Sequence, residues 1–284
     1  MAAFSYAIYN FWPSLQALVW PSVFSLVATM SMWVLMVLLL AAAWGMLLRC
    51  LGAKSARPFL IVDIHAHSWL GRYLPAKAGL LLGKTLRSRE LALSVGVVAR
   101  SVLIEQLMFL AVGAVMASAY LWFSPAGQQF LRWGAVDATQ FGPIIIGALG
   151  VFLLVASLAI LRRTAGGSMP AFPIACITIL LVLSHSASGM AMYFLASGLG
   201  LAIDVTLLQW VGLSSLVNIS GSAAMIAPAG LGVREAVMGV ALSANESSAS
   251  LIIYLMLFRL LTMVVDASYL GACLTIKFLG RQDA

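Results

Sequence analysis

Charged residues are scarce in this chain. Asp, Glu, Lys and Arg make up 9% of its 284 residues, whereas 63% are apolar, and the mean hydropathy is +1.05. In soluble globular domains about a quarter of the residues are charged, so a water-soluble domain is excluded and the bilayer is the expected solvent. At roughly 20 apolar residues per spanning helix, residues 1–284 accommodate about five to seven spans in a single integral membrane domain.

Cysteines and catalytic motifs are also few. The three cysteines lie on separate apolar segments without C-x-x-C spacing, which argues against a disulfide framework or a zinc site. Asp63, His65 and His67 alternate, but on a helix only Asp63 and His67 share a face, so no metal site is predicted. Because no Ser/His/Asp order, nucleotide-binding loop or HExxH signature occurs, the sequence recommends neither an enzyme nor a cofactor.

The formal net charge of +7 raises the alternative of nucleic-acid binding. The basic residues, however, lie in short loops between apolar runs, as the orientation signals of membrane proteins do. The cluster after the first apolar run, and Arg162 and Arg163 after a later one, mark cytoplasmic ends. We therefore expect no nucleic-acid partner, an N-terminus outside the cell membrane and a cytoplasmic C-terminus.

The hydropathy pattern predicts an all-α, polytopic transmembrane helix bundle. Its expected parts are an interfacial N-terminal segment at 1–21, a first unit at 22–122, connecting spans at 141–199 and a second unit at 207–279.

Two segments of this bundle are too polar or too broken to be lipid-facing spans. Residues 59–75 hold Asp63, two histidines and Arg72, and residues 207–232 are rich in Ser, Gly and Ala, include Asn218 and end in a proline and glycines. Irregular backbone is tolerated at membrane depth only inside protein or along a water-filled cavity. We therefore expect two re-entrant, broken helical elements.

Each expected re-entrant element ends in a proline–glycine motif and precedes a long helix that contains an arginine. The first motif is Pro75-Ala-Lys77-Ala-Gly79, before Arg100, and the second is Pro228-Ala-Gly230-Leu-Gly232, before Arg259. The expected topology gives the two units opposite orientations. This layout is typical of the inverted repeats of secondary transporters.

Charges within the expected spans are the sharpest functional signal. An arginine at the bilayer centre costs at least about 2.5–3.5 kcal/mol, so Arg100 and Arg259 need partners. Arg259 and Asp266 share a helix face and can flank a polar site, whereas Arg100 and Glu105 diverge and should find partners on other helices. The alternatives are structural ion pairs and, for Arg100, a side chain that snorkels to the membrane surface.

The second proline–glycine motif predicts an anion site. A helix is expected to begin near Gly232, where free backbone N–H groups and Arg234 attract a phosphate-containing head group; the alternative is a simple turn. Arg72 and Lys77 would receive the same phosphate on the inner side, unless they are orientation signals alone. The candidate substrate-binding residues are Arg72, Lys77, Arg100, Glu105, Asn218, Gly230, Gly232, Arg234, Glu235, Arg259 and Asp266.

These motifs resemble those of a known family. The residues that carry the resemblance are Pro75-x-Lys77-x-Gly79, Glu105, and Pro228-x-Gly230-Leu-Gly232-Val-x-Glu235 followed by Arg259. They are similar to the membrane domain of the lysylphosphatidylglycerol synthase and flippase family, in particular its stand-alone members without the aminoacyl-transferase domain. The chain departs from the family pattern at Leu80, where an acidic residue is common, at Gln106, where Arg is common, and at Ala229, where Gly is usual.

The resemblance implies a bacterial inner-membrane protein that transfers lipids between leaflets. The implied substrate classes are aminoacylated phosphatidylglycerol, polyprenyl-linked sugars and hopanoid-type lipids. Together with the buried charges, it favours a lipid translocase that binds a membrane lipid with an anionic head group. Two other functions stay open: a scaffold of lipid or glycan biosynthesis, and a membrane enzyme that uses Glu105, Glu235 or Asp266 as an acid or base. The protein partner is either a second copy of the chain or a lipid-biosynthesis protein.

Overall fold

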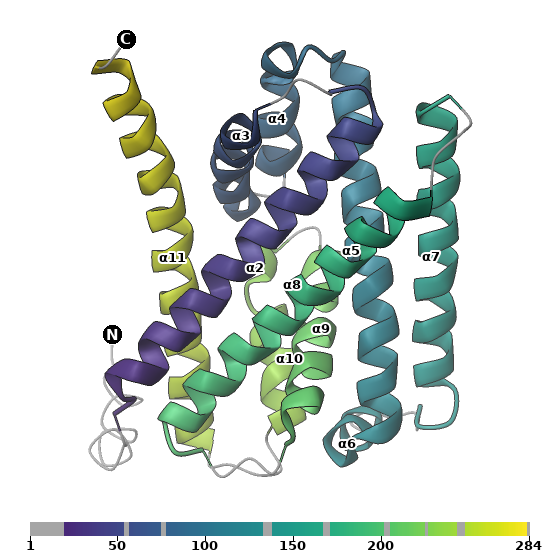
Figure 1. Ribbon diagram of the computed structural model, residues 1–284. Helices are drawn as coiled ribbons and strands as arrows, with labels where there is room; N and C mark the ends of the chain where they lie inside the picture. The colour runs from purple at the N-terminus through teal and green to yellow at the C-terminus, as the bar shows by residue number, and fades with distance from the viewer. Residues whose placement is uncertain are drawn as a thin grey trace.

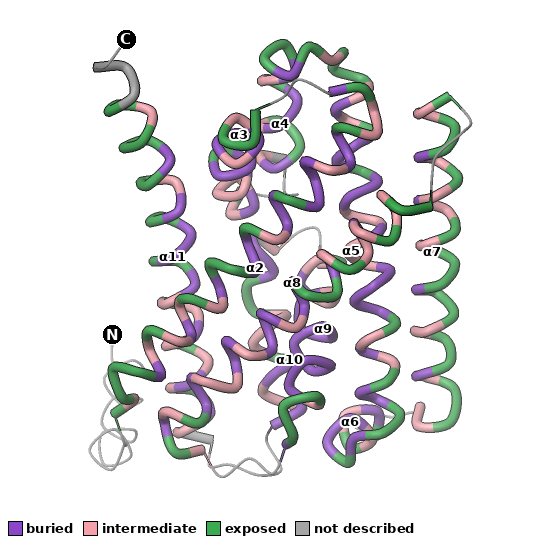
Figure 2. The backbone as a smooth tube through the Cα atoms, viewed as in Figure 1, coloured by how far each residue is buried: buried purple, intermediate pink, exposed green. Residues whose placement is uncertain are grey.

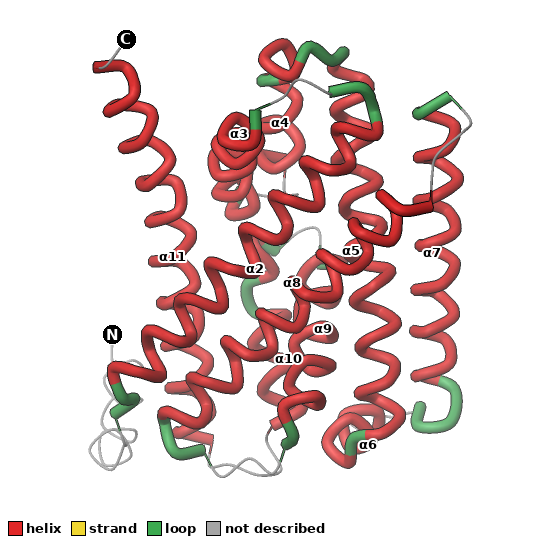
Figure 3. Tube along the Cα trace, viewed as in Figure 1, coloured by secondary structure: helices red, strands yellow, loops and turns green. Residues whose placement is uncertain are grey.

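The computed structural model is all-helical over the residues that it describes. These are residues 20–53, 57–74, 78–132, 138–166, 171–201, 205–224, 227–242 and 248–282. Within these ranges the chain forms helices, turns and short connections and no strand (Figures 1 and 3). The predicted all-α class is therefore confirmed, whereas the predicted interfacial segment at 1–21 lies almost wholly outside the described residues.

Among the described helices, five are long and apolar enough to cross a membrane. They are α2 (Val23–Cys50), α5 (Val95–Phe123), α7 (Gly142–Thr164), α8 (Ala171–Gly198) and α11 (Ser248–Gln282). Serine caps begin the first two, because Ser22 and Ser94 accept hydrogen bonds from the backbone N–H groups of Ser25 and Val97. The expectation of a polytopic membrane protein is confirmed.

The lipid-facing surface is visible in the burial pattern. Much of α7 is exposed in Figure 2, and its exposed side chains include Ile145, Phe152 and Val155. In a membrane, such side chains lose nothing by facing lipid tails, so helix association depends on close packing instead. Gly189 illustrates this: a Cβ there would lie 2.5 Å from the Cα of Val211, so the glycine lets α8 pack closely on the neighbouring helix.

The remaining helices include two helical hairpins within the described residues. The first comprises α3 (Pro58–Leu70), η1 (Gly71–Tyr73) and α4 (Ala78–Leu86), with η3 (Ser88–Leu91) after it. The second comprises α9 (Leu207–Ala223), η4 (Pro228–Gly230) and α10 (Val233–Leu242). A further short helix, α6 (Pro125–Arg132), lies in the 123–140 connection, where a loop was expected.

Both hairpins close through a glycine–glycine contact. A Cβ on Gly79 would lie 2.5 Å from the Cα of Gly71, and a Cβ on Gly230 would lie 2.7 Å from the Cα of Gly221. Any larger residue would push the backbones apart, since real Cβ atoms do not approach so closely. The hairpins therefore share one closing device, and their tips, η1 and η4, are in contact with each other.

A separate small core anchors the first hairpin. Ile61 and Ile64 of α3 pack with Trp44 and Leu48 of α2 and with Val98 of α5. Trp44 is completely buried and donates a hydrogen bond from Nε1 to Ser101 Oγ over 3.1 Å. This packing fixes α3 against two spanning helices and places its C-terminal end, with η1, at the centre of the bundle.

Candidate functional site

A polar cavity lies where the two hairpin tips meet. It has a volume of about 50 Å³, enough for a few water molecules. Its lining includes Trp33, His65, Trp69, Arg72, Lys84, Glu105, Gln106, Asn218, Ser222 and Arg234. A smaller pocket of about 20 Å³ shares Trp33, Asn218 and Arg234 with it and adds Glu235 and Arg259. We refer to these two adjacent spaces, which share lining residues, as the central cavity.

Asp266 is the buried anchor of this cavity. Its side chain is fully buried and Oδ1 accepts hydrogen bonds from the indole N–H groups of Trp33 and Trp69, over 3.2 and 2.9 Å. Its other oxygen, Oδ2, accepts from Arg72 Nη2 over 2.5 Å and from Tyr73 O–H over 2.7 Å. Four donors therefore surround this carboxylate. Its negative charge holds η1 and the Arg72 guanidinium against α11.

Three described arginines converge on the central cavity: Arg72 from η1, Arg234 from α10 and Arg259 from α11. We name them the arginine cluster. The Tyr73 ring lies 5.1 Å from Cζ of Arg72 and 5.7 Å from Cζ of Arg259. Electrostatic interactions link Arg234 to both of the other guanidinium groups. The cluster is therefore a concentration of positive charge among buried side chains.

All three members of the cluster carry unused hydrogen-bond donors. Nε of Arg72, Nε of Arg234 and both Nε and Nη2 of Arg259 are buried and have no hydrogen-bond partner among the described residues. Arg259 Nε lies 3.9 Å from Oε1 of Glu235, too far for a hydrogen bond. Glu235 instead accepts a hydrogen bond on Oε2 from the backbone N–H of Gly232 over 2.7 Å, at the start of α10.

The backbone of the second hairpin makes room for Arg234. A Cβ at Gly221 would collide with Nε of Arg234, so the glycine allows the guanidinium to lie against α9. Ala229, Gly230 and Gly232 all have positive φ, at 51°, 70° and 82°. The predicted need for glycine at positions 230 and 232 is thus a backbone requirement of the turn into α10.

Glu105 faces the cavity but is already paired. Its Oε2 lies 2.5 Å from Nζ of Lys84, and both side chains are buried. The Lys84 ammonium also lies 4.3 Å from the centroid of the Trp44 ring. The prediction that Glu105 has a partner on another helix is confirmed. The sequence did not single out Lys84, because it stands at the head of the basic cluster at residues 84–89, which was interpreted as an orientation signal.

The other sequence candidates are placed as follows. Asn218 lines the cavity and donates a hydrogen bond from Nδ2 to Ser188 Oγ over 3.0 Å. Arg100 is exposed on α5 and does not line the cavity, so the expectation that it lies at a buried site is wrong. The helix turns the Arg100 side chain away from the inward-facing Glu105. Lys77 lies outside the described residues.

Several contributors to the cavity were missed from the sequence. Trp33, Trp69 and Tyr73 all hold Asp266, yet aromatic residues are common in membrane spans and their spacing gives no sign of this role. Leu80 and Gln106, two of the departures from the family pattern, both line the cavity. The differences from the family thus fall inside the candidate site.

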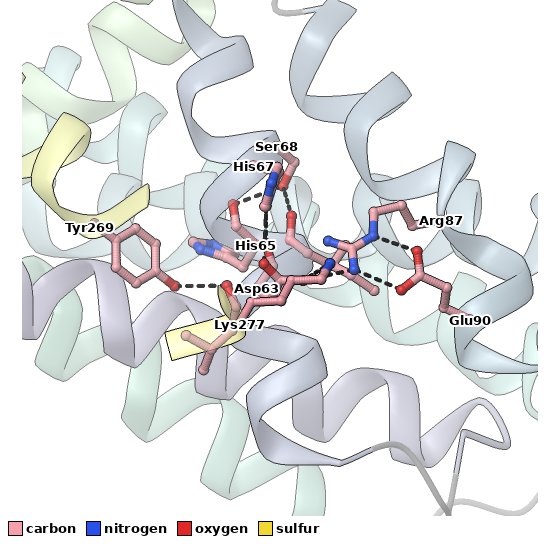
Figure 4. Close-up of polar contacts among 10 residues, drawn as sticks. Asp63, His65, His67, Ser68, Arg87, Glu90, Tyr269 and Lys277 are labelled. Carbon is pink, nitrogen blue, oxygen red and sulfur yellow. Dashed lines mark hydrogen bonds and ion pairs between the residues drawn. The ribbon is translucent and has the colours of Figure 1, made fainter. Parts of the chain in front are cut away.

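A second polar cluster ties the first hairpin to α11, away from the cavity (Figure 4). Asp63 Oδ2 lies 2.7 Å from Nη2 of Arg87 and 3.5 Å from Nζ of Lys277, and His67 Nδ1 lies 3.2 Å from Asp63 Oδ1. Arg87 also binds Glu90 through two nitrogens. No group of three or more potential metal ligands was found in the described part of the chain.

The charged groups in this second cluster shift one another's pKa values. Burial raises the pKa of Asp63, but Arg87 and Lys277 more than offset it and hold this pKa below its usual value. Hydrogen bonds from Arg87 lower the pKa of Glu90, and bonding to Glu90 raises the pKa of Arg87 despite its partial burial. All three groups are therefore charged near neutral pH.

Neither known protein families nor curated proteins match this chain. The resemblance to the lysylphosphatidylglycerol synthase and flippase family therefore rests on the motif residues alone and stays a prediction.

Proposed function

We propose that this protein binds an anionic lipid by its head group at the arginine cluster and moves it between the leaflets of the bacterial inner membrane. The observation that carries the proposal is the set of buried, unused N–H donors on Arg234 and Arg259. A buried donor without a partner costs about 1–3 kcal/mol, and more when it is charged. A ligand with several acceptor oxygens would remove that cost.

The charge balance favours an anion over a neutral lipid. Four cations, the arginine cluster and Lys84, surround the cavity, but Asp266 and Glu105 are each engaged with one of them. Glu235 lies 3.9 Å from Arg259, beyond hydrogen-bonding distance, and its Oε2 accepts a hydrogen bond from the backbone N–H of Gly232. Arginine binds phosphate bidentately through its planar fork of donors, so a phosphate head group fits the unused atoms.

Two hairpins that meet at their tips offer a route across the membrane. The 13 residues of α3 are about 20 Å long at 1.5 Å per residue, less than the roughly 30 Å hydrocarbon core. We propose that the hairpins are re-entrant and enter from opposite sides, so that the central cavity lies near the midplane. The shared glycine–glycine closure supports an inverted repeat of this kind. Movement of either hairpin would then open the cavity to one side.

The proposal is tested by leaflet exchange in reconstituted vesicles. Purified protein is placed in vesicles that carry a fluorescent phosphatidylglycerol or a fluorescent phosphatidylcholine, and a membrane-impermeant quencher reports the lipid that reaches the outer leaflet. We expect exchange of the anionic lipid to be accelerated more than that of the zwitterionic lipid. Arg234→Gln and Arg259→Gln should each slow it, whereas Arg100→Gln, which alters an exposed arginine, should not.

Two outcomes would overturn the proposal. One is exchange at the rate of protein-free vesicles for every anionic lipid tried. The other is equal slowing by the Arg100 variant and the cavity variants, which would point to a general loss of surface charge. Mass analysis of the lipid after the assay adds a separate check, because a membrane enzyme would change the lipid's mass whereas a translocase leaves it unaltered.

A further inference from the structure

A large apolar groove runs along the outside of the bundle beside the central cavity. It has a volume of about 730 Å³ and is formed by α2, α3 and α11. Its lining residues are Val27, Met30, Ser31, Val34, Leu38, Phe59, Val62, Val265, Ser268, Tyr269, Ala272, Cys273 and Ile276. In Figure 1, α3 lies between the C-terminal part of α11 and the upper part of α2, and α11 contacts both of these helices.

The groove and the cavity are lined by neighbouring residues of the same helices. On α11, Val265 faces the groove and the next residue, Asp266, is bound by the cavity residues Arg72 and Trp69. On α2, Met30 and Val34 line the groove, whereas Trp33 lines the cavity. The helices α2 and α11 thus have apolar side chains on the side of the groove and contacts to the cationic site on the side of the cavity.

Two polar links between α3 and α11 border the groove. Tyr269 donates a hydrogen bond from its O–H to the backbone C=O of Val62 over 3.2 Å. Nearer the C-terminal end of α11, Lys277 reaches Asp63 over 3.5 Å and is partly exposed (Figure 4).

We propose that this groove holds one hydrocarbon chain of the lipid whose head group binds at the arginine cluster. This inference rests on the proposed function and adds where the lipid tail lies. Small-molecule sites are concave and mostly apolar, with a few placed polar groups. An anionic lipid joins one long apolar part to one anionic part. The groove lies on α2 and α11, whose residues Trp33 and Asp266 contact Arg72 and its unused Nε donor, so the groove and the arginine cluster together match both parts in a single ligand.

The groove is tested first by photocrosslinking. An anionic phospholipid with a diazirine on one acyl chain is incorporated into vesicles with the protein, and crosslinked residues are mapped by mass spectrometry. We expect adducts on Ser268, Ala272 and Cys273 that unlabelled phosphatidylglycerol displaces and phosphatidylcholine does not. These adducts should fall several-fold in an Arg234→Gln/Arg259→Gln double variant. The exposed α7 residues Ile145 and Phe152 serve as the control, with adducts that respond to neither change.

The outcomes separate specific occupancy from ordinary lipid contact. If groove and α7 adducts respond alike to competitor and double variant, the groove holds only bulk lipid and the inference is overturned. If the groove gives no lipid adducts but crosslinks to a second copy of the chain or to another protein, it is a protein interface and the inference is equally overturned.

A second test fills the groove. Ala272→Phe places a ring in it, and the matched control, Ala148→Phe, places the same ring on the exposed face of α7. We expect Ala272→Phe to slow exchange of long-chain phosphatidylglycerol and to leave binding of a short-chain dihexanoyl analogue unchanged, with normal thermal stability. If Ala272→Phe exchanges long-chain lipid normally while the arginine variants do not, the tail site is wrong and the proposed function stands. If the arginine variants also behave normally, the proposed function itself fails.

Discussion

The buried pair of Lys84 and Glu105 gives the sharpest test of how charge is balanced inside this protein. The two side chains are 1% and 5% exposed, and 2.5 Å separates Nζ from Oε2. Replacing Glu105 with Gln would leave the Lys84 ammonium buried without its counter-charge. Breaking a buried pair in this way costs about 3–5 kcal/mol. The cation–π contact between Lys84 and the Trp44 ring contributes roughly 0.5–2 kcal/mol at most. Because the native protein already has this contact, it does not compensate for the loss of the Glu105 charge.

Removing both charges together should cost much less. In a Lys84→Met/Glu105→Leu double variant no buried charge remains, and apolar replacements of similar volume are often neutral or stabilising. The measurement is thermal unfolding in detergent, followed by tryptophan fluorescence. Each kcal/mol of lost stability lowers the unfolding temperature by at least about 2 °C. Glu105→Gln should therefore lower the unfolding temperature by about 6 °C or more. Glu90→Gln, at a carboxylate that is 45% exposed, serves as the control and should lower the unfolding temperature by no more than about 2 °C.

The same variants decide what Glu105 does. If the pair is structural, the double variant exchanges anionic lipid at a rate near that of the native protein. If Glu105 contacts the substrate, as the sequence alone predicted, the double variant is stable but slow. The reasoning about charge balance is refuted if Glu105→Gln is as stable as the native protein, or if the double variant is as unstable as the single one.

Three further predictions concern the backbone at two positions and the ion pairs of the buried Asp63. Gly79→Ala should destabilise the protein by about 1–3 kcal/mol because its Cβ meets the Gly71 backbone, whereas Gly271→Ala, with open space around it, should be neutral; thermal unfolding of both variants tests this. Ala229→Gly should raise stability by up to about 1 kcal/mol, since Ala229 has φ of 51°, and an unchanged or lower unfolding temperature would contradict it. The depressed pKa of Asp63 means that its ion pairs stabilise the fold above about pH 4 and are lost as pH falls through the folded-state pKa. Asp63→Asn should therefore show a smaller loss of unfolding temperature on acidification than the native protein, and equal losses would rule this out.

Much of the architecture could be predicted from the long apolar runs and from the basic or polar loops that separate them. The starts of α2, α7 and α9 lie within one residue of the expected starts at 22, 141 and 207, because long apolar runs between basic or polar loops leave few other choices. The two broken segments were predicted for a similar reason. Polar side chains and glycines at membrane depth require shielding, and the glycines at 79 and 230 indeed lie at backbone contacts.

The contents of the cavity could be predicted only in part. Arg234, Arg259, Glu235 and Asp266 stand out because charge is rare in apolar segments. Their pairing depends on how helices far apart in the chain are packed, and one sequence carries no signal of that. Arg72 rather than Arg259 binds Asp266 for this reason, although Arg259 lies on the same helix. Lys84 was not predicted because it begins a run of basic residues at 84–89 of the kind that usually marks membrane orientation. Arg100 was predicted wrongly because periodicity alone does not say which face of a helix is buried.

The central claim is that the arginine cluster holds an anionic head group, and native mass spectrometry of the purified protein tests it most directly. We predict that the native protein retains phosphatidylglycerol in preference to phosphatidylcholine from an equimolar mixture. The Arg234→Gln/Arg259→Gln double variant should lose that preference, while Arg100→Gln keeps it. Equal retention of the two lipids by the native protein, or an undiminished preference in the double variant, would contradict the account.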